Sequence, residues 1–487
     1  MYFDASTQFQ VTKCPIRTSI KVNRNTLTVL LALSIAFVAT HEASAETYLL
    51  KQGEQSHSRT VKAVLEVEGN VRLNPDGKKV REFPMTMKGN LQYDERLLGP
   101  EHPIAAIRHY TTASADMTMS GKPNKSSLAH SKSLIALEHK GAKASFFTPQ
   151  NHLQREEIDL INIPGNSLLI DFLLPKQKVA INDTWTFKNE ELVGLLCLDA
   201  ISANDVKAKL TAVKDNVAQM ELSGTVAGAI DGIATDIKLK GRVNFDFKTE
   251  CINWVAIAIE EDRSIGHTAP GFRVTAVLRV LIVPRDIPET LTDEKLAKLD
   301  LTPDEGKLLI ELESQTGFRL MHEPNWHVLS ENEKTTVFRM VKRGELVSQC
   351  NITRLNNLNA GEHMTIEAFQ RDVQKALGDN FGQIIDASQR VNSQQLRELR
   401  LTVTGASNQL PITWVYYLFS NDLGHRYSVV FTLESNLTDK FAEADRSLVS
   451  SFELLARPEP KAAPTAAATE EEEPAIQSAS NETDEVK

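Results

Sequence analysis

The segment His322-Glu-Pro-Asn-Trp-His327 places two histidines and a glutamate close together, which makes it the first place to look for chemistry in this chain. A zinc site of the HExxH type needs histidines four residues apart on one helix face. These two are five apart, about 140° around a helix, and Pro324 is excluded from a helix interior. In an extended chain the same spacing puts them on opposite faces. We therefore predict an extended corner here and no metal site.

Motifs for catalysis or cofactor binding are not found in the sequence. It contains no GxSxG elbow, no phosphate-binding loop and no CxxC pair. Asp422, His425 and Arg426 cluster in a predicted loop, where turn formation accounts for these residue types. We predict a protein without catalytic residues, cofactor or bound metal.

Three cysteines follow residue 45. Cys197 and Cys251 could form a disulfide, which would leave Cys350 free. Both also lie in apolar stretches, LVGLLCLDA and ECINWV, that suit a buried free thiol equally well. The sequence leaves both alternatives open.

The N-terminus has the pattern of an export signal. Lys21 and Arg24 precede a 13-residue apolar run over 27–39, and Ala43 and Ala45 stand at the small-residue positions of a cleavage site. A helix of this length reaches only about 20 Å, against a hydrocarbon core about 30 Å thick, so a cleaved signal is favoured over a membrane anchor. We predict cleavage between Ala45 and Glu46, and a periplasmic or secreted protein without a membrane span.

Hydrophobic residues make up 41% and charged residues 24% of the 487-residue chain, which is typical of globular protein with more than one domain. The net charge is -10, and half of it lies in a low-complexity acidic tail, residues 456–487, which we predict to be disordered. A nucleic-acid-binding protein needs a basic face, and nothing in this mildly acidic sequence suggests one.

Residues 46–288 alternate apolar and polar side chains over several segments, which predicts a curved antiparallel β-sheet domain. Such segments are 61–73, 83–93, 237–247 and 272–282. A dense apolar stretch over 191–201 predicts a helix against one face of the sheet. Gly224, Gly228 and Gly232 would share one face of a strand, where the missing side chains allow a close approach.

After Pro288 the pattern changes. Thr302, Pro303 and Glu305 form a capping box, which predicts a helix within a connector over 289–315. In the last domain, over 316–455, Thr365 and Gly378 bound a predicted amphipathic helix. A second helix is predicted from Thr438, and strands with a hairpin at Arg343-Gly344 fill the rest.

The last domain resembles the PsbP-like family, which includes PsbP, Mog and DcrB proteins, in its strand, Pro-x-Trp corner and second strand around Pro324 and Trp326. The resemblance implies an α/β/α sandwich, so the expected fold class is α+β. The first domain loosely resembles the half-barrel of LolA-type envelope proteins, in architecture only.

The PsbP-like resemblance implies a binding or assembly module rather than an enzyme. We therefore expect an exported, non-catalytic envelope protein that binds a protein or envelope component through its second domain. The alternative is a periplasmic lipid or lipoprotein carrier that uses the concave face of the first sheet.

Expression in a bacterial host tests the export signal. Intact mass and N-terminal sequencing of the exported protein should give Glu46 as the first residue. A retained apolar run over 27–39 would contradict cleavage after Ala45. The twenty residues before Lys21 are long for the start of an export signal, which suggests the hypothesis that translation begins near Val22. In the uncleaved precursor, a peptide covering 4–13 would exclude that start.

Overall fold

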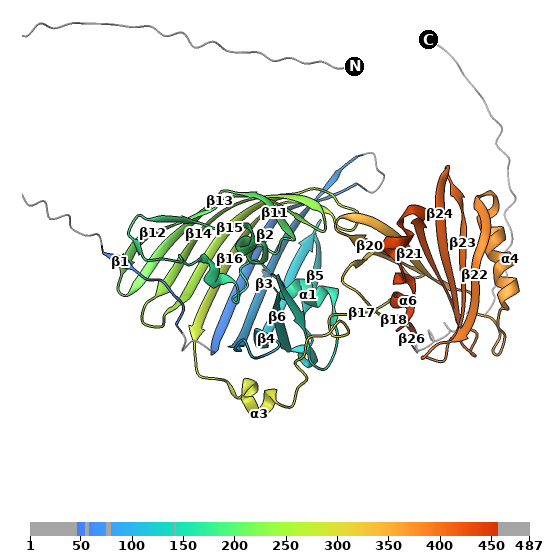
Figure 1. Cartoon of the computed structure of the whole chain (residues 1–487), viewed down its shortest axis with the longest axis horizontal. Helices are drawn as coiled ribbons and strands as arrows, with labels where there is room; N and C mark the ends of the chain where they lie inside the picture. The colour runs from blue at the N-terminus through green and yellow to red at the C-terminus, as the bar shows by residue number, and fades with distance from the viewer. Residues whose placement is uncertain (1–45, 54–57, 75–78, 141–142, 456–487) are drawn as a thin grey trace, which may run out of the picture. The chain divides into compact units, whose positions relative to one another are not determined.

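The structure is a computed structural model that describes residues 46–53, 58–74, 79–140 and 143–455 (Figure 1). The predicted export signal, residues 1–45, and the predicted disordered tail, residues 456–487, lie outside the described residues. Strands account for 55% of the structure and helices for 14%, in several antiparallel sheets.

The predicted fold class, α+β with an α/β/α sandwich, is therefore wrong. Among the described helices only α4 (Ile366–Leu377) is longer than seven residues. Where the sandwich needs a second helical layer, the structure has one-turn helices and a small sheet. None of the described helices combines the length and apolar character needed to cross a membrane.

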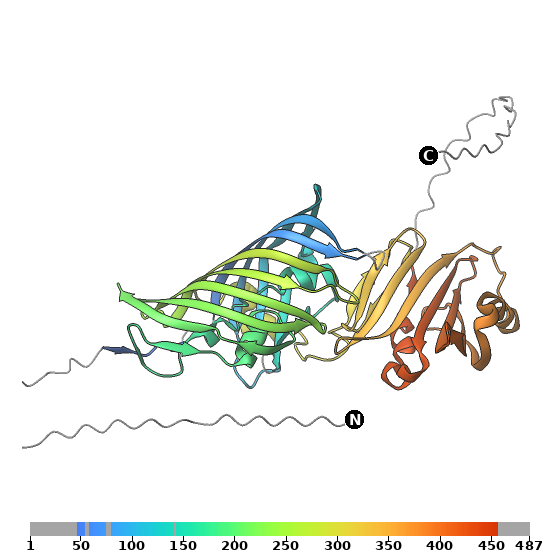
Figure 2. The ribbon, with the colours of Figure 1, turned by 90° about the horizontal axis from the view of Figure 1, so that it is seen from above.

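A 13-stranded sheet holds most of the first half of the chain, and its long strands lie side by side in Figures 1 and 2. Its path runs β10-β12-β13-β14-β15-β16-β2-β3-β4-β6-β7, with β11 on β13 and β5 on β4. The strands are β2 (Ser58–Leu73), β3 (Arg81–Leu97), β4 (Ala106–Met119), β5 (Lys122–Ser127), β6 (Leu134–Lys140), β7 (Lys143–Phe147), β10 (Thr184–Thr186), β11 (Ala200–Asn204), β12 (Lys207–Lys214), β13 (Val217–Ile230), β14 (Ile233–Asp246), β15 (Cys251–Arg263) and β16 (Gly271–Pro284).

The alternating pattern decides which face of this sheet is buried. In β14, Ile237, Leu239 and Val243 are buried while Lys238 and Lys240 are exposed. The strands predicted from this alternation are present as β2, β3, β14 and β16. We call this apolar side the inner face and the opposite side the outer face. The outer face is polar over most strands, but over β4, β6 and β7 it is apolar and packs against the connector.

Residues 153–206 cover the inner face. This segment contains β8 (Leu153–Gln154), α1 (Arg155–Ile161), the 3-10 turn η2 (Ile170–Leu173) and α2 (Asn189–Leu195), and a short ladder joins β9 (Val179–Ala180) to β1 (Thr47–Tyr48). Its apolar side chains join the sheet in one core; they include Leu160, Leu169, Ile170, Leu192 and Leu195. The helix predicted over 191–201 is thus present, but it ends at Leu195.

A buried charged network fastens this segment to the sheet. Glu95 accepts hydrogen bonds from Arg59 Nε (2.5 Å) and Arg108 Nε (2.7 Å), and also from Ser167 Oγ (2.9 Å). Arg59 also donates to the Ser167 carbonyl (2.8 Å). Burial alone would raise the pKa of Glu95, but the two guanidiniums outweigh it and lower that pKa to about 2. Glu95 is therefore ionised at neutral pH.

A seven-stranded antiparallel sheet forms the core of the second half of the chain. Its order is β19 (Trp326–Glu331), β20 (Thr335–Lys342), β21 (Glu345–Leu355), β25 (Arg426–Glu434), β24 (Leu410–Ser420), β23 (Arg397–Ser407) and β22 (Phe381–Val391). On one face α4 buries Phe369 and Val373 against Leu399 and Leu401. Thr365 caps α4 through Ala368 N (3.2 Å) and Gly378 ends it with φ 52°, so this helix prediction is confirmed.

The other face is covered by short elements. These are α5 (Thr438–Phe441), α6 (Ala444–Val449) and a four-stranded sheet of β26 (Glu453–Leu454), β18 (Phe318–His322), β17 (Ile310–Glu313) and β8. The single helix predicted from Thr438 is broken because Ala442 adopts φ 49°. The buried residues here include Phe318, Trp326, Phe431 and Phe452.

The connector differs from the predicted helix. It holds η3 (Glu289–Leu291) and α3 (Asp293–Leu296), and the capping-box segment after Thr302 forms turns followed by β17. Ile310 and Leu312 pair with His322 and Leu320 of β18, so strand pairing overrides the local helix signal. The remaining described turns of helix are η1 (His130–Lys132), η4 (Gly378–Asn380) and η5 (Ser435–Leu437).

Substitution of Glu95 tests the buried network. Glu95→Gln removes the counter-charge of Arg108 and leaves Arg59 only the more distant Asp171 (3.9 Å), so it should lower the free energy of unfolding by about 3–5 kcal/mol at pH 7 in urea titrations. The lowered pKa gives Glu95 a stabilising effect that is complete above about pH 4.5 and is lost as the pH falls toward about 2. The difference in free energy of unfolding between wild type and Glu95→Gln should become smaller over that pH range.

Glu294→Gln is the matched control, because Glu294 pairs with Lys298 on the surface and is 84% exposed. It should leave the urea midpoint unchanged. An equal effect of the two substitutions would contradict the structural role of the network.

Candidate binding hollow on the outer sheet face

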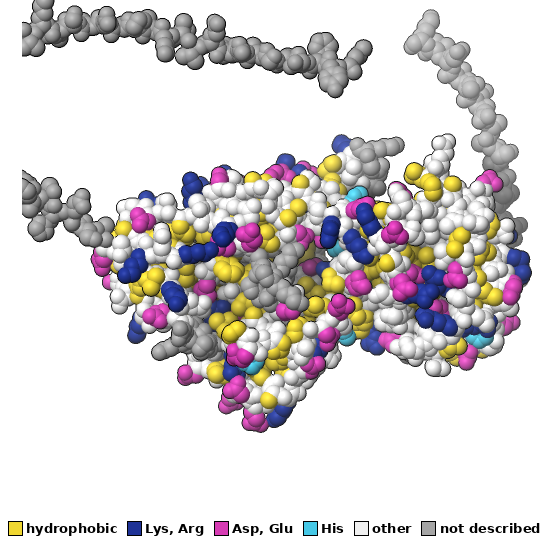
Figure 3. Space-filling model, in the orientation of Figure 1, with side chains coloured by type: hydrophobic (Ala, Val, Ile, Leu, Met, Phe, Trp, Pro, Cys, Tyr) yellow, Lys and Arg dark blue, Asp and Glu magenta, His cyan; other side chains and the backbone are white. Residues whose placement is uncertain are grey.

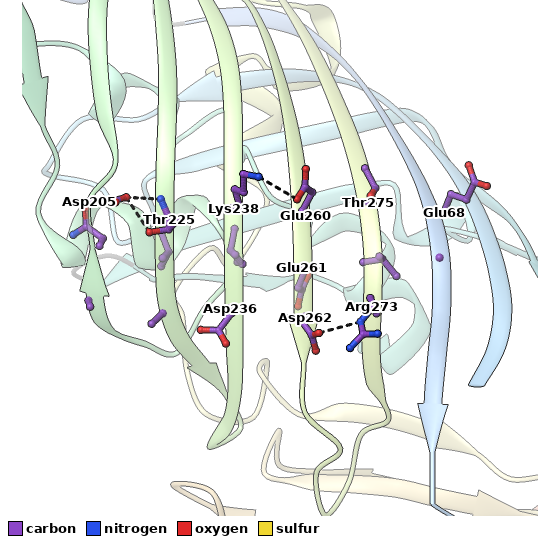
Figure 4. Close-up of a pocket in the computed structure, with 17 residues that line it drawn as sticks. Glu68, Asp205, Thr225, Asp236, Lys238, Glu260, Glu261, Asp262, Arg273 and Thr275 are labelled. Carbon is purple, nitrogen blue, oxygen red and sulfur yellow. Dashed lines mark hydrogen bonds and ion pairs between the residues drawn. The ribbon is translucent and has the colours of Figure 1, made fainter. Parts of the chain in front are cut away.

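A hollow of about 860 Å³ lies on the outer face of the 13-stranded sheet, over β13 to β16 and β2 (Figure 4). Residues of β11 and the link that follows it form one rim. Among the described residues that line the hollow, none is a histidine, a cysteine or a serine; the lining includes Glu68, Asp205, Thr225, Asp236, Lys238, Glu260, Glu261, Asp262, Arg273 and Thr275.

Strand register places the polar side chains of the hollow in rows. One row crosses five neighbouring strands because each residue is paired with the next. In order from β13 to β2 it consists of Thr225, Lys238, Glu260, Thr275 and Glu68, as Figure 4 shows. The next row contains Asp236, Asp262 and Arg273.

Some of these charges are paired. Arg273 Nε lies 3.1 Å from Asp262 Oδ2, Arg72 binds the other oxygen of Asp262, and Lys238 lies 3.6 Å from Glu260. Slight burial would raise the pKa of Asp262, but the two arginines outweigh it and lower that pKa. Asp262 is thus a carboxylate at neutral pH.

Acidic groups exceed basic groups in the hollow. Six acids line it, against Lys238 and Arg273, but Glu261 is paired in register with inward-facing Ile237 and forms an ion pair with Arg263, which leaves five acids on the outer face. Glu68 and Asp236 have no ion-pair partner among the described residues, and both side chains are exposed. The surface therefore offers carboxylates in defined positions to a positively charged ligand, in a site too open to exclude water.

Glycines shape the rim of the hollow. Gly224 has φ 154°, and a Cβ there would lie 2.5 Å from Val206 Cα. A Cβ on Gly228 would lie 2.7 Å from the Ala200 carbonyl oxygen. The predicted close approach is therefore present at Gly224 and Gly228, and it lets the chain around Asp205 lie tightly beside β13. There Asp205 accepts hydrogen bonds from Thr225 N (2.5 Å) and Oγ1 (3.0 Å). Gly232 lies in the turn between β13 and β14, so the three glycines do not share one strand face as predicted.

The structure separates the two histidines of the HEPNWH segment onto different strands. His322 ends β18, and His327 lies in β19 after a turn at Pro324 and Asn325, so the predicted extended corner is present. Burial lowers the pKa of His322 to about 4, and its Nδ1 lies 2.9 Å from the Glu323 carbonyl oxygen. Burial also lowers the pKa of His327, which lies 3.9 Å from Asp231.

Across the described part of the chain, no group of three or more His, Cys, Asp or Glu side chains could hold a metal ion. The cysteines Cys197, Cys251 and Cys350 are free thiols, so the disulfide alternative for Cys197 and Cys251 is not formed in this structure. Burial raises the pKa of Cys197 to about 12, so its thiol stays protonated at neutral pH.

Of the predicted loop cluster, Asp422 takes part in a hydrogen-bonded set with His363 and Ser420, which were not predicted to lie there. His363 Nδ1 lies 3.3 Å from Ser420 Oγ, and its Nε2 lies 3.2 Å from Asp422 Oδ1. Ser420 is only 4% exposed, whereas the Asp422 side chain is 96% exposed. A nucleophile needs the opposite arrangement, with an accessible serine and a sheltered carboxylate. His425 and Arg426 bind loop groups, Asn421 and the Asn356 carbonyl.

The hollow was not predicted from the sequence. Its polar residues were visible as the solvent-facing half of each alternating strand. Their assembly depends on the pairing of β16 with β2, which joins strands from opposite ends of the first half of the chain. The alternation of apolar and polar residues along a strand does not specify that β2 is the neighbour of β16.

No protein-family model and no curated protein matches the chain. Among solved structures, it is similar to cyanobacterial PsbP from Synechocystis sp. PCC 6803, with 14% identity and a TM-score of 0.25, over 30% of this chain and 92% of that one. A Bacteroides thetaiotaomicron protein matches with 14% identity and a TM-score of 0.22, over 30% of this chain and 47% of its own length.

Lipovitellin matches with 8% identity and a TM-score of 0.28, over 50% of this chain and 26% of its own length. The chain thus spans about half of the Bacteroides protein and about a quarter of lipovitellin. A likeness to PsbP extends over part of the chain, and the LolA-like resemblance of the first domain is not seen. At these scores the likenesses carry no inference about function.

Gly69→Ala tests the backbone geometry of the hollow. Gly69 in β2 has φ 152°, and an added Cβ would lie 2.2 Å from the Arg273 carbonyl oxygen. The substitution should lower the free energy of unfolding by about 1–3 kcal/mol. Gly89→Ala in β3 is the control, because its Cβ would meet only ordinary contacts at 3.9 Å; it should leave stability unchanged or raise it slightly. Equal effects would contradict the tight contact between Gly69 and β16.

Proposed function

We propose that this protein is a non-catalytic binding module of the cell envelope, and that its outer-face hollow binds an extended, positively charged segment of a partner protein. The excess of carboxylates in the hollow carries this proposal. Glu68 and Asp236 are its key groups, because both are exposed and no described residue neutralises either of them.

The dimensions of the hollow suit an extended chain. Five strands spaced about 4.8 Å apart span roughly 19 Å, which is the length of about six residues of extended peptide. Carboxylates occur along this span in adjacent rows, from Asp236 on β14 to Glu68 on β2. A lysine or arginine at alternate positions of a ligand could reach them while its backbone lies over Thr225 and Thr275.

Openness supports binding rather than catalysis in the hollow. The hollow is exposed to bulk water, whereas a catalytic site gains from excluding it. Location in the envelope rests on the export signal predicted for residues 1–45.

A lipid or lipoprotein carrier is the alternative function. It would use the inner face, which residues 153–206 fill with apolar side chains and fasten through Ser167 to Arg59 and Glu95. An acyl chain could enter only if that segment left the sheet. The covered inner face and the open outer face therefore favour the binding module.

A charged-peptide titration tests the proposal. The full chain should bind a fluorescein-labelled hexa-arginine peptide at low salt and should not bind the hexa-glutamate equivalent. The double substitution Glu68→Gln with Asp236→Asn should weaken hexa-arginine binding about tenfold, which corresponds to about 1.4 kcal/mol.

Glu333→Gln with Asp372→Asn is the matched control, because it removes the same charge from exposed positions outside the hollow. Equal weakening by both double variants would mean that only net charge matters and would overturn the assignment of the hollow. Native mass spectrometry of the same preparation distinguishes the alternative, since co-purified lipid would support a carrier.

A further inference from the structure

A basic band lies beside the hollow on the outer face of the 13-stranded sheet. It occupies the next two register rows, which run from β12 through β16 and β2 to β3. Six bases and two acids project from these rows: Lys88, Lys207, Lys209, Lys240, Arg242 and Arg279, with Glu66 and Glu221. The band is thus opposite in charge to the hollow.

The two acids of the band leave most of the positive charge unneutralised. Glu66 accepts from both Arg279 (2.8 Å) and Lys88 (3.1 Å), and Glu221 lies 3.7 Å from Arg242. Lys207, Lys209 and Lys240 have no ion-pair partner within the residues that the structure describes, and all three are exposed.

A trough of about 570 Å³ runs between these bases. Its outer-face floor is made by the small side chains of Ser223, Ala256 and Ala258, and Lys240, Arg242 and Arg279 stand around it. Small side chains in the floor let the backbone of an extended ligand come close to the sheet, while the long basic side chains reach its acidic groups.

We propose that the trough is occupied by the chain's own acidic segment Glu470–Glu473. Four consecutive carboxylates match the excess of four positive charges in the band. The segment begins 15 residues beyond Leu455, the last described residue, and such a linker reaches up to about 50 Å.

Covalent connection favours this occupant over free polyanions. A segment on a linker of this length is present at an effective concentration in about the millimolar range. The contact joins exposed charges, so it is screened by salt and opens readily. An external polyanion must displace the tail to reach the band. This inference is independent of the ligand proposed for the hollow.

Zero-length cross-linking of carboxylates to amines, followed by peptide mass spectrometry, tests the proposal on the full chain. At low salt the peptide containing 470–473 should be joined to Lys207, Lys209 or Lys240 in preference to other exposed lysines. The yield should fall at least about fivefold in 0.5 M sodium chloride, where the Debye length is about 4 Å. It should disappear when all four glutamates are changed to Gln.

Two triple variants locate the contact. Lys207→Gln, Lys209→Gln and Lys240→Gln together should expose the tail to a protease that cleaves after Glu. Lys122→Gln, Lys334→Gln and Lys375→Gln together should not, although they remove the same charge from exposed sites. The four-glutamate variant does not alter the sheet, so the test holds even if a lysine variant fails to fold.

Cross-links spread evenly over all exposed lysines would overturn the proposal. A mixture of chains with light and heavy isotopes distinguishes a tail contact within one chain from a contact between two chains. Cross-links that join light to heavy chains would place the tail on a second copy and would also overturn intramolecular docking.

Discussion

The apolar inner face of the 13-stranded sheet must be kept from water, and this requirement organises the first half of the chain. Residues 153–206 meet it by laying Leu160, Leu169, Leu192 and Leu195 against the sheet. Burial of apolar surface stabilises the fold by about 25 cal/mol for each Å² and is the main favourable contribution to folding. Buried arginines on the same face then need a counter-charge, which Glu95 provides. Ser167 lies in the covering segment and hydrogen-bonds to both Arg59 and Glu95, so it links the segment to the charged network.

Because the inner face is occupied, the outer face is the surface that this sheet offers to other molecules. Antiparallel register fixes which outward side chains become neighbours, and it sorts them into an acidic hollow and a basic band. Adjacent rows along a strand lie about 7 Å apart, which is close to the Debye length of about 8 Å at physiological salt. The electric fields of the hollow and the band therefore partly cancel each other. A ligand must match the positions of these charges as well as their signs.

Local patterns in the sequence predicted much of the secondary structure. Alternation located β2, β3, β14 and β16, and caps located α4, because these signals act between residues close in sequence. The prediction of a connector helix was wrong at Ile310 and Leu312, because strand pairing with β18 outweighs the capping box. The predicted fold class was wrong because short helices and a small sheet, rather than a second helical layer, cover one face of the seven-stranded sheet. The hollow could not be predicted, since it needs the long-range pairing of β16 with β2.

Hydrogen–deuterium exchange with and without a hexa-arginine peptide tests whether the outer face binds ligand while the inner face stays covered. Adding the peptide should slow exchange in β13 to β16 around Lys238 and Glu260 and leave exchange over 160–198 unchanged. Unchanged strands together with altered exchange in 160–198 would contradict that expectation, because the covering segment would then be the part that responds to ligand.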